Sequence, residues 1–157
     1  MSDKTEPGPI LVPVDFSESS EAALMFAVGL SRCMQCSLLV LHVVHDPGSM
    51  PGYYSRALKK KQLVRIEDGA AEMLDEFVHR VVKQHPELKD LNLESMMVKG
   101  LPSTRILEVA DKINATMIVV GSKGLTGLKH MLMGSVAEHL VHLCRIPVTV
   151  VKVPHGH

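Results

Sequence analysis

Short apolar runs alternate with longer amphipathic stretches along this sequence. Five of the runs are predicted strands, at residues 10–14, 37–44, 91–98, 116–120 and 147–151. The run from Met117 to Val120 is continuously apolar. That pattern is typical of a strand buried on both faces, because a half-exposed strand alternates apolar with polar residues.

Apolar residues recur at helical spacing in the stretches between these runs. The predicted buried positions are Ala22, Ala23, Phe26, Ala27 and Leu30 in the first helix, Leu63, Ile66, Ala70, Met73, Phe77 and Val81 in the second, Ile106, Val109, Ala110 and Ile113 in the third, and Val136, Leu140 and Leu143 in the fourth. Each helix is therefore expected to pack one face on a core.

Strands and helices alternate from the first strand to the last. A helix between two successive strands favours parallel pairing, because such a crossover returns the chain to the same end of the sheet. Right-handed crossovers then predict an α/β fold, a doubly wound five-stranded parallel sheet with helices on both faces. With 157 residues, 46% of them hydrophobic, we expect a single domain over residues 1–157 with its core at about residues 9–153.

The composition argues against several kinds of partner. Lysine plus arginine number 17, as do aspartate plus glutamate, so no overall charge attracts nucleic acid or an anionic membrane. No apolar run approaches the roughly 20 residues of a membrane-spanning helix, and the polar start lacks a signal peptide's hydrophobic stretch. We therefore expect a cytoplasmic protein without membrane insertion.

A glycine-rich segment between a buried predicted strand and the last predicted helix is the strongest candidate for a binding site. Gly121, Gly124, Gly127 and Gly134 allow backbone to approach a ligand, and they can take positive φ so that successive N–H groups surround a phosphate. In a doubly wound sheet this segment lies at the carboxyl edge, where ligands bind. Spacing alone is equally compatible with a long loop that glycines merely shape.

Ser135 stands at the start of the last predicted helix. With Glu138 three residues later it matches a capping box, so it is predicted to cap that helix while its hydroxyl faces the crevice. Neither G-x-x-x-x-G-K-[ST] nor G-x-G-x-x-G occurs in the sequence. The P-loop and dinucleotide-binding interpretations therefore lose most of their support.

The spacing G-x2-G-x9-G-[ST], filled by Gly121, Gly124, Gly134 and Ser135, resembles the pattern of ATP-binding universal stress proteins. Other segments are similar to that family as well: ILVPVDFSESSEAA at 10–23, LHVV at 41–44, GLP at 100–102 and CRIPVTVV at 144–151. The resemblance covers about residues 9–153, nearly the whole chain.

The resemblance implies an adenine nucleotide alpha hydrolase-like fold with strand order 3-2-1-4-5 and a nucleotide at the switch between the first and fourth strands. The implied ligand is ATP, or alternatively ADP or AMP, with or without Mg²⁺ or Mn²⁺. The implied contacts are Asp15 with the ribose hydroxyls, Pro13 and Val14 with the adenine pocket, the backbone of Val43 with the adenine edge, and Gly121, Ser122, Gly124, Gly134, Ser135 and Val136 with the phosphates. No residue is assigned a catalytic or metal-ligating role.

Two of these features have other interpretations. Asp15 lies at a strand-to-helix turn with Glu18 three residues later, which also matches a helix cap. The C-x-x-C of Cys33 and Cys36 lacks the further ligands of a zinc site, so we expect apolar packing rather than metal or redox chemistry.

Three functions are compatible with the sequence. The favoured one is a regulatory module in which bound ATP alters the dimer surface or the loop at residues 45–55 that an unknown protein partner reads. Tyr53 and Tyr54 in this loop either stack on the base or are exposed loop residues, which is the commoner case. The alternatives are slow ATP hydrolysis or nucleotidyl transfer, for which no general base is evident, and a nucleotide-free dimerising scaffold. The last predicted strand, from Pro147 to Val151, is β-prone, and at the sheet edge that the resemblance implies it is expected to pair in a homodimer.

Overall fold

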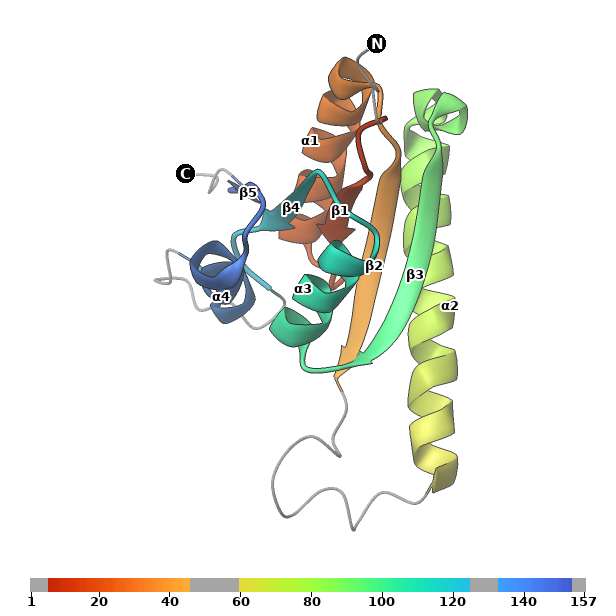
Figure 1. Ribbon diagram of the computed structural model, residues 1–157. Helices are drawn as coiled ribbons and strands as arrows, with labels where there is room; N and C mark the ends of the chain where they lie inside the picture. The colour runs from red at the N-terminus through yellow and green to blue at the C-terminus, as the bar shows by residue number, and fades with distance from the viewer. Residues whose placement is uncertain (1–5, 46–59, 125–132, 154–157) are drawn as a thin grey trace.

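The five apolar runs form a parallel sheet in the order β3-β2-β1-β4-β5 (Figure 1). The strands are β1 (Ile10–Pro13), β2 (Leu38–His45), β3 (Leu93–Gly100), β4 (Met117–Gly121) and β5 (Val148–Val151). Each neighbouring pair is parallel. The predicted α/β class and strand order are thereby confirmed. The strands are parallel because every connection between them passes through a helix.

The computed structural model describes residues 6–45, 60–124 and 133–153. Gly127, Tyr53, Tyr54 and all but the first residue of the loop predicted at 45–55 lie outside these ranges. None of the helices in the described ranges combines the length and the apolar character that crossing a bilayer requires.

Helices cover both faces of the sheet. They are α1 (Glu18–Met34) and α2 (Lys60–Gln84) on one face and α3 (Pro102–Lys112) and α4 (Ser135–Leu143) on the other, with a short 3-10 helix, η2 (Pro86–Asp90), before β3. Side chains of β1 alternate between the two cores, since Ile10 and Val12 pack toward α1 and α2 while Leu11 packs toward α3 and α4. All of β1 is therefore buried, as its unbroken apolar run predicts.

The buried face of α1 differs from the predicted one. Phe26 was expected in the core but is 47% exposed. Leu24 and Val28 are buried instead, beside the predicted Ala23 and Ala27. Both sets of residues recur at a spacing of four, so periodicity alone does not distinguish them, and the packing of α1 on the sheet selects the second.

The longest helix is buried over only part of its length. Phe77 and Val81 are buried as predicted, together with Leu74, whereas Ile66 and Met73 are 43% and 50% exposed. Figure 1 shows that the first turns of α2 extend beyond the ends of β2 and β3. Apolar residues in those first turns have no sheet beneath them, whereas Met73 lies further along the helix and is exposed beside the buried Leu74. Helical periodicity reveals neither difference.

The cap predicted for α4 is wrong. The helix begins at Ser135, and its N-cap is Gly134, which offers no side-chain hydrogen bond. A capping side chain must belong to the residue before the first helical one, so Ser135 does not fill that role. Ser135 is instead the first helical residue, and it is exposed.

Candidate functional site

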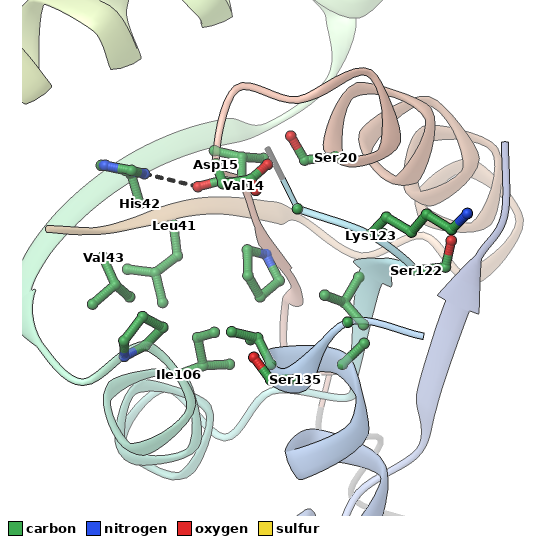
Figure 2. Close-up of a pocket in the computed structure, with 18 residues that line it drawn as sticks. Val14, Asp15, Ser20, Leu41, His42, Val43, Ile106, Ser122, Lys123 and Ser135 are labelled. Atoms are coloured by element: carbon green, nitrogen blue, oxygen red, sulfur yellow. Dashed lines mark hydrogen bonds between the residues drawn. The ribbon is translucent and has the colours of Figure 1, made fainter. Parts of the chain in front are cut away.

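A pocket with a volume of about 360 Å³ opens at the carboxyl edge of the sheet (Figure 2). From this edge β1 leads through α1 to β2, while β4 leads through α4 to β5 on the other side. Because the two connections diverge and their helices lie on opposite faces, they leave a crevice between them.

The ten residues predicted to contact a ligand all line this pocket: Pro13, Val14, Asp15, Val43, Gly121, Ser122, Gly124, Gly134, Ser135 and Val136. They come from the ends of β1, β2 and β4 and from the start of α4. Parallel strands end at the same edge, which brings these distant sequence positions together.

Other lining residues were not found by sequence reasoning: Ser20, Leu41, His42, Pro102, Ile106, Val120 and Ala137. For some of these residues the sequence contained a pattern that could have placed them at the pocket. Leu41 precedes the predicted Val43 by two positions and so shares its face of the strand. Pro102 and Ile106 carry no comparable signal, because only the packing of α3 on β2 brings them to the pocket.

One wall of the pocket is apolar. Figure 2 shows Leu41, Val43 and Ile106 on the same side of β2. Leu41 and Ile106 are almost fully buried, at 0% and 2% exposure, and Pro102 at the start of α3 extends this wall. A flat apolar group therefore finds a dry surface here.

The turn from β1 to α1 is held from the opposite face of the sheet. The Nδ1 atom of His42 lies 2.8 Å from the carbonyl oxygen of Val14, which can only accept, so Nδ1 donates. Phe16 has a φ of 68°, which is rare for a bulky residue. Its ring packs on His42 and on Phe77 of α2, with centroid distances of 4.4 and 5.7 Å. These contacts fix the turn that carries Asp15.

Asp15 does not cap α1, contrary to the alternative interpretation of its position. Its Oδ1 atom accepts from the backbone N–H of Ser17 at 3.1 Å and from the Ser17 hydroxyl at 2.5 Å. Ser17 is the N-cap, and its Oγ accepts from the N–H of Ser20 at 3.2 Å. The carboxylate of Asp15 is thus oriented through the capping residue and remains part of the pocket lining.

Gly121 and Gly124 are needed for space and not for unusual backbone angles. Among the glycines of the described ranges, positive φ occurs at Gly100 and not at the motif positions. A Cβ atom on Gly121 would lie 2.6 Å from Ser19 Oγ. One on Gly124 would lie 2.7 Å from Asp15 Oδ2, and one on Gly134 3.4 Å from the carbonyl oxygen of Ser122. The expectation of positive φ at these glycines was therefore wrong.

Hydrogen bonds close the two ends of the glycine-rich segment on each other. The N–H of Gly134 donates to the carbonyl oxygen of Ser122 at 2.6 Å, and the N–H of Ser122 donates to Val151 in β5 at 2.9 Å. The N–H of Lys123 donates to Ser19 Oγ at 3.3 Å. The start of α4 is thereby set against the pocket, and the unpaired N–H groups of a helix's first turn favour an anion.

The C-x-x-C pair lies far from this pocket, because Ser20 places the start of α1 at the pocket and Cys33 lies about 20 Å further along that helix. Cys33 is exposed, whereas Cys36 is half-buried, and this burial raises the pKa of the Cys36 thiol. No group of three or more metal-ligating side chains is found within residues 6–45, 60–124 and 133–153.

The fold and the pocket define an α/β protein with a ligand site at the topological switch point of a doubly wound parallel sheet. The sequence profile of the universal stress protein family matches residues 7–152, and the chain belongs to that family. The universal stress protein MJ0531 of Methanocaldococcus jannaschii is 30% identical over 145 residues, which cover 92% of this chain and 82% of that protein.

Solved structures of the same family share the fold. The universal stress protein UspA from Lactobacillus plantarum is 26% identical, with a TM-score of 0.77, and the match covers 92% of this chain and 97% of that one. The universal stress protein from Archaeoglobus fulgidus, solved in complex with dAMP, is 25% identical, with a TM-score of 0.62 and coverage of 94% and 99%.

Proposed function

We propose that this chain binds an adenine nucleotide in the pocket, ATP or alternatively ADP or AMP, and acts as a cytoplasmic, nucleotide-dependent regulatory module within a single domain. The observation that carries the proposal is the convergence of three surfaces in one pocket. These are an apolar wall, an oriented carboxylate at Asp15, and the glycine-flanked start of α4. They suit a base, a ribose and a phosphate respectively.

The base is expected to contact the apolar wall and the backbone of Val43. Leu41 directs its carbonyl toward β1, where it accepts from the N–H of Val14 at 2.8 Å. Val43 lies two residues further along β2 and directs its backbone groups the same way, but β1 has already ended at Pro13. Backbone groups at a strand position without a neighbour need another partner, which the edge of adenine can supply.

The phosphates are expected at the start of α4. Backbone at Gly121, Ser122 and Gly124 lies beside Gly134 and Ser135 in the pocket lining, so few side chains separate a phosphate from N–H groups. A bound Mg²⁺ or Mn²⁺ would be held mainly through the phosphate oxygens, as is usual for nucleotide-bound magnesium.

A binding role fits the pocket better than rapid hydrolysis. Asp15 is the acidic residue among the described lining residues, and in the proposed binding mode it contacts the ribose. A general base must lie within hydrogen-bond reach of the water that attacks the phosphate. The related protein from Archaeoglobus fulgidus, solved with dAMP, supports an adenine nucleotide as ligand.

Heat denaturation of the purified protein tests this function. We expect chromatography of the supernatant to reveal ATP, ADP or AMP, and calorimetry on the emptied, refolded protein to show rebinding. Val43→Trp should abolish binding because the indole would occupy the space beside the apolar wall that the base needs. Met96→Trp, at an exposed position of β3, should not affect binding. A wild type that releases no nucleotide and binds none of the three at millimolar concentration would contradict the proposal.

We further propose a homodimer through β5, which lies at one edge of the sheet. The carbonyls of Pro147 and Val151 accept from Ile118 and Ser122 on the β4 side, at 2.9 Å each. The alternating residues Val148 and Val150 therefore direct their backbone groups to the open edge. On the adjacent α4, Val141 and Leu143 are 47% and 62% exposed, although Leu143 was predicted to be buried. A two-fold axis at this edge would pair the strand with its copy and cover these side chains.

Val150→Pro should convert this dimer to a monomer. Proline removes the N–H at the open edge but none that pairs with β4, so the fold itself should survive. Light scattering at micromolar concentration should give twice the 17.2 kDa chain mass for the wild type and the chain mass for the variant. Val150→Ala retains the N–H and should remain dimeric. A monomeric wild type, or a dimer that tolerates the proline, would place the interface elsewhere.

A further inference from the structure

We propose that Gly124, besides the phosphate contact proposed for its backbone, serves the nucleoside half of the ligand by leaving room for the Asp15 carboxylate. The inference rests on the proposed function and assigns a positioning role to one glycine of the motif. The ribose contact and the glycine-rich segment are then coupled, because Asp15 Oδ2 occupies space that a side chain at position 124 would need.

The contact is specific to the carboxylate. A Cβ atom added to Gly124 would lie 2.7 Å from Asp15 Oδ2 and 4.0 Å from Asp15 Cγ, and it meets no other described atom within 4 Å. Real Cβ atoms essentially never approach another heavy atom below 3.0 Å. The φ of Gly124 lies outside the left-handed region, so alanine can adopt the backbone conformation and the effect of a methyl group is purely steric.

The carboxylate cannot move aside without loss. Its Oδ1 atom accepts both hydrogen bonds from Ser17, at 3.1 and 2.5 Å, and Ser17 is itself buried as the cap of α1. The turn is fixed on its other side by the contacts of Phe16 and His42. A methyl group at Gly124 therefore pushes the carboxylate against its hydrogen bonds to Ser17 or displaces the backbone after β4. Either movement takes Oδ2 away from the position in which it can accept from a ribose hydroxyl.

Gly134 provides a matched control within the same motif. Its added Cβ would lie 3.4 Å from the Ser122 carbonyl oxygen, an ordinary contact, and Asp15 is not among its neighbours. Gly134→Ala thus adds the same methyl group at the phosphate side of the pocket without touching the carboxylate.

The test is a double-mutant cycle with two ligands. The affinities of adenosine, which has no phosphate, and of ATP are measured by calorimetry for the wild type, Gly124→Ala, Asp15→Ala, the double variant and Gly134→Ala. We expect Gly124→Ala to weaken both ligands by the same factor, on the order of tenfold and no more than Asp15→Ala does. In the Asp15→Ala background the added loss should be less than about twofold. Gly134→Ala, on the phosphate side, should weaken ATP more than it weakens adenosine.

Two results would overturn the inference while the proposed function stands. One is a Gly124→Ala variant that binds ATP more weakly but adenosine normally, which would confine the role of Gly124 to the phosphates. The other is a pair of losses that multiply in the double variant, since independent sites are additive in free energy.

Failure of the proposed function gives a different result. If the wild type binds neither ligand, thermal unfolding still tests the contact, because Gly124→Ala should lower the Tm in the wild-type background and not in the Asp15→Ala background. If Gly124→Ala alone does not fold, the double variant should fold, because the clashing carboxylate is gone. A double variant that also fails to fold, or equal losses of Tm in both backgrounds, refutes the inference.

Discussion

Gly121→Val is expected to lower the free energy of unfolding by about 3 kcal/mol, the upper part of the range for overpacking a dense interior. An added Cβ would lie 2.6 Å from Ser19 Oγ and 2.7 Å from the carbonyl carbon and oxygen of the same residue. Two of these three atoms are backbone, so no rotamer change relieves the overlap. The helix α1 would have to separate from β4, and these two elements are in extensive contact.

Urea unfolding followed by circular dichroism measures this loss, which is a large share of a total stability of roughly 5 to 15 kcal/mol. Gly29→Val is the matched control, because Gly29 lies in α1 with no neighbour within 4 Å of an added Cβ. That substitution should be neutral or slightly stabilising, since valine has a higher helix propensity than glycine. Equal stability of Gly121→Val and wild type would show that α1 and β4 do not approach so closely.

Asp15→Ala is expected to weaken ATP binding by about 1.5 to 3 kcal/mol, or about 10- to 150-fold in affinity. The reason is that the carboxylate accepts charge-assisted hydrogen bonds, which are the strong ones in a half-buried site. The change also removes the acceptor for Ser17, so the free energy of unfolding should fall by about 1 kcal/mol as well. Calorimetry with ATP and thermal unfolding measure the two effects separately.

Ser17→Ala distinguishes a binding role of Asp15 from a purely structural one. It removes the cap of α1 and the hydroxyl partner of Asp15 but leaves the carboxylate in place. Stability should then fall by about 0.5 to 2 kcal/mol, the usual range for an N-cap, with a much smaller loss of ATP affinity than Asp15→Ala. If the two variants lose the same stability and both bind ATP as the wild type does, Asp15 only supports the turn.

The order of elements and the place of the pocket follow from the sequence. Five apolar runs separated by helical periodicity permit only a handful of arrangements once parallel pairing and right-handed crossovers are required. Residues at the carboxyl ends of the parallel strands, such as Asp15 after β1 and Gly121 at the end of β4, must then meet at one edge of the sheet. The strand order itself came from the resemblance, which the structure confirms.

What the sequence left undecided depends on contacts between distant segments. The same spacing rules fit Phe26 or Leu24 as the buried residue of α1, and Ser135 or Gly134 as the cap of α4, until the packing against the sheet is known. Similarly, the spacing of the glycines indicated that another group approaches the backbone closely, but it did not indicate which group. Only the tertiary structure places Gly121 against α1 and Gly124 against Asp15, because those distances are set by how β1, β4 and α1 are packed together and not by any local pattern along the chain.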